Sequence, residues 1–187
     1  YAFGVWWSRF KAYSQDEYLG LMDRFEEEGI PLTVATVDMD WHWTDLNSRF
    51  GTNYKKRPMM DNPCTGGWTG YSWNSQLFPD YRDFLRRLKE KNLAVTLNLH
   101  PADGIRFHED MYPQMASAMG MDPAKGEPVN FSPANSDFWN NYFKYVIHPY
   151  EKDGVDFWWI DWQQGEKSDL KGLDPLWALN HFHFLDN

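Results

Sequence analysis

Cysteine is nearly absent from this sequence, which has one among its 187 residues. An internal disulfide and a multi-cysteine metal cluster are therefore excluded. No apolar run approaches the length that spans a bilayer, so no membrane partner is expected. Acidic residues outnumber basic ones, 27 to 18, and the net charge of −9 argues against nucleic acid as a partner. The start of the chain shows no signal-peptide pattern, which leaves the compartment open with the cytoplasm slightly favoured.

Aromatic residues are abundant instead, at 18% of the chain with 11 Trp. The hydrophobic content of 42% is sufficient for one packed domain, or part of one. Some of these aromatic side chains must lie in the core. Others can line a cleft that stacks flat apolar ligands such as sugar faces.

Short apolar, β-branched runs alternate with segments of helical spacing along the chain. The expected strands are Phe3–Ser8, Leu32–Asp38, Ala94–Leu99 and Phe157–Asp161, the last one fully buried. The first expected helix begins at the capping box of Ser14 and Glu17. Further helices are expected at Tyr81–Lys91, Met111–Met119, Asp137–Ile147 and Pro175–Leu185. Long irregular segments follow the second and third strands, and such segments are usually functional.

This β-α-β-α order predicts an α/β fold of the (β/α)8 TIM-barrel type. The whole chain, 1–187, is expected to form one partial catalytic domain with about the first four βα units and long βα loops. A doubly wound sheet should carry a glycine-rich phosphate turn after its first strand, and Ser8–Lys11 is not one. A half-barrel has two unpaired strand edges, so we expect it to self-associate or to be marginally stable.

Two carboxylates, Asp38 and Asp161, come at the ends of the second and fourth strands. The carboxyl ends of barrel strands carry the chemistry, and a pair of carboxylates there suits glycoside hydrolysis. Asp38, Asp40 and His42 alternate, so on a continued strand they would share a face. That set, together with His100, could equally hold a divalent metal. One of the carboxylates, most plausibly Asp40, could instead cap the loop, and His100 could be a buried hydrogen-bonded histidine.

Two motifs resemble glycoside hydrolase family 31, the α-glucosidase and α-xylosidase family. Val155–Trp162 resembles its fourth-strand motif, which is a Trp, one intervening residue and an Asp. Trp159 and Asp161 fall on the Trp and Asp positions of that motif. Val37–Asp40 resembles its second-strand Asp-x-Asp. Gly4–Arg9 and Phe78–Asp80 are also similar to that family's first strand and second helix, so the resemblance covers nearly the whole chain.

This resemblance implies a retaining α-glycosidase that acts on α-linked glucosides or related glycosides and needs no cofactor and no metal. Asp161 would be the nucleophile, and Asp38 would bind sugar hydroxyls. Met39, Trp159, Trp162 and His100 would complete the sugar site. The carbohydrate substrate is then the main expected partner.

Departures from the family pattern concern the sugar site rather than the reaction. The fourth-strand motif continues Trp162-Gln163-Gln164 where Met-Asn-Glu is common, and the third strand ends His100-Pro101 where Asp-Pro is common. The family's acid/base Asp falls beyond these residues, so we expect the isolated chain to be inactive. The alternatives are a metal-dependent barrel hydrolase using Asp38, Asp40, His42 and His100, and a carbohydrate-binding aromatic module. Helical crossovers count against the latter.

Overall fold

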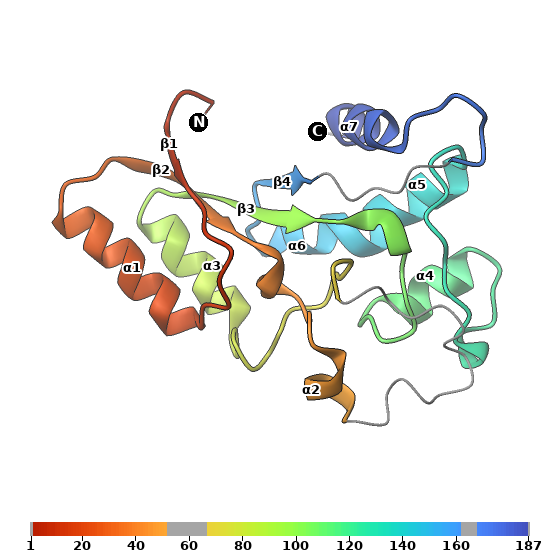
Figure 1. Cartoon of the computed structure of the whole chain (residues 1–187), viewed down its shortest axis with the longest axis horizontal. Coiled ribbons are helices and arrows are strands. Elements are labelled where there is room, and N and C mark those ends of the chain that lie inside the picture. Colours follow the sequence, from red (N-terminus) through yellow and green to blue (C-terminus); the bar gives the residue numbers. More distant parts are fainter. Residues whose placement is uncertain (1, 52–66, 162–167, 187) are drawn as a thin grey trace. The chain divides into compact units, whose positions relative to one another are not determined.

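The computed structural model describes residues 2–51, 67–161 and 168–186 (Figure 1). The chain divides into two compact units. The first comprises Tyr1–His42, Trp73–Asn98 and Tyr150–Trp159, and the second comprises Trp43–Ser72, Leu99–Pro149 and Ile160–Asn187. The first unit contains nearly all of the sheet, because only the last residue of the third and of the fourth strand belongs to the second unit.

One four-stranded sheet forms in the order of the chain, β1-β2-β3-β4. Its strands are β1 (Val5–Trp7), β2 (Leu32–Val37), β3 (Ala94–Leu99) and β4 (Phe157–Ile160). The first three pair in parallel, with Trp6 opposite Val34 and Val34 opposite Ala94. β4 continues the sheet, because the amide of Asp156 donates to the carbonyl of Val95 at 2.9 Å. This sequential parallel order is that of consecutive βα units and confirms the expected partial α/β barrel.

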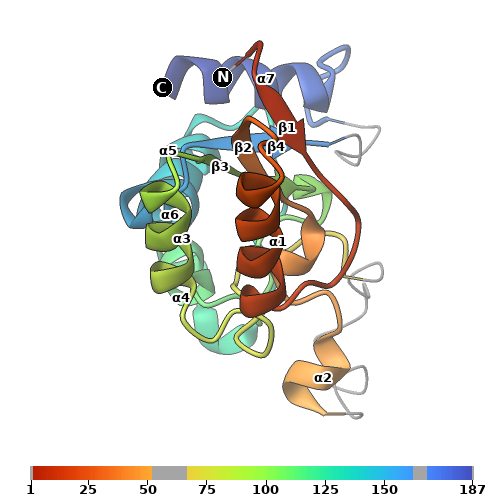
Figure 2. The ribbon, with the colours of Figure 1, turned by 90° about the vertical axis from the view of Figure 1, so that its left-hand side faces the viewer.

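Helices α1 (Gln15–Glu27) and α3 (Tyr81–Glu90) lie side by side in the first unit (Figure 2). The predicted capping box begins α1: the Glu17 amide donates to the Ser14 hydroxyl, and the Ser14 amide donates to the Glu17 carboxylate. The core beneath them is apolar, and the Tyr18 hydroxyl is buried there, donating to the carbonyl of Thr36 at 2.8 Å. Both helices thus follow the sequence pattern.

The two outer strands are less buried than the sequence suggests. β2 is buried over its second half and β3 is buried throughout, whereas all four residues of β4 are only half-buried. The expectation of a fully buried fourth strand is therefore wrong. On β1, Val5 is 43% exposed and Trp6 is 46% exposed. Both strands are at the edges of the described sheet, where a neighbouring strand is lacking on one side.

The second unit consists mainly of short helices and the loops between them. Its helices are α2 (Leu46–Phe50), α4 (Tyr112–Ala118), α5 (Ser136–Tyr142) and α7 (Pro175–Asp186), with 3-10 turns at Pro101–Asp103 and Pro123–Lys125. The rings of Trp139 and Phe182 stack at 4.6 Å between centroids, which joins α5 to α7. No helix within the described ranges combines the length and apolar character needed to cross a membrane.

The third crossover helix is longer than expected. The sequence predicts its end before Pro149, but it continues as a π-helical turn, η5 (Phe143–Ile147), and then as α6 (His148–Asp153). Pro149, which has no N–H to donate, therefore lies inside a continuous helical path, directly after the π-helical turn. The wide turn of η5 precedes it without a break in the helical path.

Candidate functional site

Asp38 stands directly after β2 and begins the next element. Its Oδ1 accepts a hydrogen bond of 2.7 Å from the amide of Met39, which makes Asp38 the N-cap of the 3-10 helix η1 (Met39–Trp41). The capping role that the sequence suggests for Asp40 therefore belongs to Asp38. A carboxylate at this place is half-buried and held at the carboxyl end of a parallel strand.

The expected alternation of Asp38, Asp40 and His42 on one extended face is wrong. The chain turns into η1 after Asp38, so these side chains no longer follow a period of two. His42 is fully buried and forms an isolated antiparallel bridge with Trp73. The ligand atoms of the three residues, all within the described part, do not gather within 4.8 Å of one another.

Trp41 shows why most tryptophans of this region are structural. Its ring is fully buried, and its Nε1 donates to the carbonyl of Asn98 at 2.8 Å. The rings of Trp73, Tyr150 and Trp158 surround it at centroid distances of 5.2, 5.9 and 6.2 Å. This aromatic cluster fixes the path of the chain after β2, in the same segment as Asp38.

The other residues expected at the sugar site differ in exposure. Met39 is buried in η1, with 5% of its surface exposed. Trp159 is half-buried in β4, next to the strand end. Trp162 lies outside the described residues. Their contacts with a sugar stay predictions.

Asp161 and His100 lie together in the second unit. The amide of Asp161 donates to the carbonyl of Leu99 at 3.1 Å, so the residue directly follows β4 and stands beside the end of β3. Its Oδ2 lies 3.3 Å from Nε2 of His100. The His100 side chain is 1% exposed and that of Asp161 is 26% exposed. A partly exposed carboxylate thus stands against a buried imidazole.

Two neighbours hold His100 in place. The Thr69 hydroxyl donates to the carbonyl of His100, and its Oγ1 accepts from the amide of Asp103 at 3.2 Å. The indole of Trp68 meets the imidazole edge-on, with centroids 5.3 Å apart and planes at 78°. Trp68 is 38% exposed, unlike the buried Trp41, Trp43 and Trp73.

Comparisons with known proteins identify the family. The model of the glycosyl hydrolases family 31 TIM-barrel domain matches residues 1–182. The chain belongs to glycoside hydrolase family 31. An alpha-xylosidase of Saccharolobus solfataricus (strain P2) is 23% identical over 168 residues, which are 89% of this chain and 19% of that protein.

Solved structures of family 31 share the fold. An alpha-xylosidase from Xanthomonas citri matches with a TM-score of 0.53 and 18% identity, over 91% of this chain and 18% of that one. A sulfoquinovosidase from E. rectale in complex with an aza-sugar inhibitor also gives a TM-score of 0.53 and 18% identity, over 91% and 25% of the two chains. The chain thus spans about a fifth to a quarter of the length of these family 31 relatives.

A buried polar cluster, which sequence reasoning missed, supports the loops of this family 31 domain. The Ser72 hydroxyl donates to Oε2 of Glu109 and accepts from the amide of Asp110 at 2.8 Å. Nε2 of His108 lies 3.3 Å from Oε1 of Glu109. Burial, together with the nearby Tyr142 and Glu109, raises the pKa of Tyr71 well above its usual value. These partners are 37 or more residues apart from Ser72 in the loops, so no local pattern reveals them.

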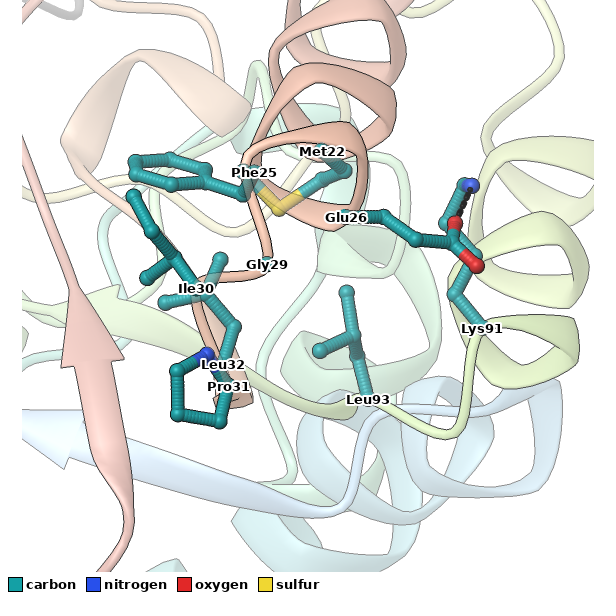
Figure 3. A pocket seen from close by; sticks show the side chains of 9 residues that line it. All are labelled: Met22, Phe25, Glu26, Gly29, Ile30, Pro31, Leu32, Lys91 and Leu93. Carbon is teal, nitrogen blue, oxygen red and sulfur yellow. Dashed lines mark hydrogen bonds and ion pairs between the residues drawn. The ribbon is translucent and has the colours of Figure 1, made fainter.

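A pocket of the first unit lies at the other end of the strands from Asp38 (Figure 3). Its lining side chains come from the end of α1, the turn before β2 and the residue before β3. At its rim, Lys91 is paired with Glu26 at 2.8 Å. Leu32 begins β2 whereas Asp38 follows its end, roughly 20 Å away at the rise of a strand. The pocket is therefore at the amino ends of the strands, which in barrels contribute to stability rather than to chemistry.

Proposed function

We propose that the protein is a retaining α-glycosidase in which Asp161 is the nucleophile. The observation that carries the proposal is the position of Asp161, a partly exposed carboxylate at the carboxyl end of a parallel strand in a family 31 domain. Attack on the anomeric carbon would form a glycosyl-enzyme ester, which water then hydrolyses. The resulting product keeps the configuration of the substrate.

Asp38 is proposed to bind sugar hydroxyls. It too follows a parallel strand directly, and the bond from the Met39 amide fixes its carboxylate. Hydrogen bonds to a fixed carboxylate can strengthen as the sugar moves toward its transition state. Trp159 would form a wall of the sugar site, with Met39 and Trp162 as further contacts.

The proposed substrates are α-linked glucosides or related glycosides. Two of the similar proteins are named alpha-xylosidases and one a sulfoquinovosidase, so α-xylosides and sulfonated glycosides belong in the same trial. These sugars share the α-linked pyranose ring and differ at carbon 6. Aryl glycosides are the fairest first substrates, because their good leaving groups depend least on acid catalysis.

The test compares Asp161→Asn with the wild type in the full-length protein, using p-nitrophenyl α-glucoside and α-xyloside. An amide cannot form the ester, so kcat should fall by about 10³-fold or more. Asp122→Asn is the matched control: Asp122 caps an exposed turn of the same unit, accepting from the amide of Ala124, and Asn caps equally well. An Asp161→Asn variant that keeps more than about a tenth of the wild-type kcat would overturn the proposal, as would a product of inverted configuration.

A further inference from the structure

His100 stands in an environment that a sugar ligand does not require. Its side chain is 1% exposed, so almost none of its surface is open to a substrate, whereas Asp161 beside it is 26% exposed. Nε2 lies 3.3 Å from Oδ2 of Asp161, within the range of an ion pair. The carboxylate of Asp161 is thus within direct reach of the buried imidazole.

The segment Gly67–Ser72 fixes the imidazole in this direction. Thr69 binds the carbonyl of His100 and accepts from the amide of Asp103, which ties both ends of the turn after β3 to one hydroxyl. Trp68 covers the ring from the side at 5.3 Å. These contacts fix the backbone at His100 and pack against its ring, so the imidazole stays beside the carboxylate.

We propose that His100 is a positioning residue for Asp161: its Nε2 holds Oδ2 of the carboxylate and thereby directs Oδ1 toward the anomeric carbon. The inference rests on the proposed function, because it needs Asp161 as nucleophile. It assigns His100 to the nucleophile in place of the sugar contact that the sequence suggests. Hydrogen bonds in an active site often tighten only when the substrate is bound, so the 3.3 Å approach would then become an N–H···O bond that fixes rotation of the carboxylate. A small misplacement of a reacting atom can cost about 10²-fold in rate.

The test uses the full-length protein with p-nitrophenyl α-glucoside and α-xyloside and compares His100→Gln with His100→Leu. The amide nitrogen of Gln can take the place of Nε2, whereas Leu has no donor. We expect His100→Leu to lower kcat by roughly 10²-fold with KM changed less than about threefold, and His100→Gln to recover most of that loss. His183→Leu is the matched control, since His183 is another buried histidine of the second unit, packed against the rings of Tyr142 and Phe143. Its kcat should equal that of the wild type.

Thr69 provides a second pair of variants should His100→Leu fail to fold. Thr69→Val keeps the shape and removes the hydroxyl that binds His100, so kcat should fall by about tenfold at constant KM, and Thr69→Ser should restore it. A wild type without glycosidase activity would overturn the proposed function and this inference with it. An active wild type whose His100→Gln is as impaired as His100→Leu, or whose variants change KM alone, would overturn only the inference.

Discussion

Each of the two units of this family 31 domain is stabilised internally by a different combination of contacts. In the first unit, paired strands and locally capped helices form the framework, as in the capping box of Ser14 and Glu17, and long-range polar contacts such as that of Trp41 with Asn98 add to it. In the second, polar side chains reach segments far along the chain: Thr69 binds His100, Ser72 binds Glu109, and Arg49 donates to the carbonyl of His108 at 2.8 Å. Regular elements therefore set where a strand ends, and long-range polar contacts set how the side chains beyond it are directed.

Asp38 both caps η1 and is proposed to bind the sugar, and Asp38→Ala should have the largest effect of the substitutions in the first unit. We expect kcat/KM to fall by about 10²-fold or more, because a hydrogen bond to a charged group contributes roughly 1.5–3 kcal/mol and more if it tightens in the transition state. Asp80→Ala is the matched control, as Asp80 caps α3 by accepting from the amide of Asp83. It should cost only about 1 kcal/mol of stability. If Asp38→Ala also changes nothing but the melting temperature, Asp38 is only a cap.

Two glycines compare the tolerance of one turn in each unit. Gly29 and Gly104 have similar positive φ angles, 67° and 64°. A Cβ on Gly29 meets open space, whereas one on Gly104 would lie 2.1 Å from the carbonyl oxygen of Val129. Gly29→Ala should therefore cost about 1 kcal/mol of unfolding free energy and Gly104→Ala about 3 kcal/mol or more. Urea unfolding of both variants measures the difference, and equal losses would contradict the close packing of the Gly104 turn.

His183 makes the second unit sensitive to acid. Burial lowers the pKa of His183 to about 4, with Asp186 acting in the opposite direction. Between the unfolded pKa near 6.5 and the folded one, the unfolded chain binds a proton that the folded chain does not, so stability is full above this window and falls as the pH falls through it. We expect the wild type to lose about 2 kcal/mol more than His183→Gln between pH 7 and pH 4.5 in urea unfolding. Parallel losses in the two proteins would contradict this.

Local patterns predicted the regular elements well. Ser14 and Glu17 identify the start of α1, and Ala94–Leu99 is the observed β3. Each of these signals depends on neighbours within a few residues. The same holds for the position of Asp161, because the strand before it is short and apolar.

Contacts across long sequence separations could not be predicted. The turn of η1 removes the expected alternation of Asp38 and His42, and it depends on the burial of Trp41 against rings from three other segments. Thr69 is 31 residues from His100, so nothing near either residue signals their bond. The half-burial of Trp159 likewise depends on what lies beside β4 and not on its own apolar run.

Covalent trapping tests the central claim, that Asp161 is the nucleophile, most directly. The full-length protein would be treated with a 5-fluoro glycosyl fluoride, which forms the glycosyl-enzyme ester and slows its hydrolysis. Trypsin places Asp161 in the peptide 153–167 and Asp38 in the peptide 25–49, so tandem mass spectrometry separates the two candidates. We predict that the label is found on Asp161. A label on Asp38, or no label on an enzyme that turns over the same sugar, would contradict the account.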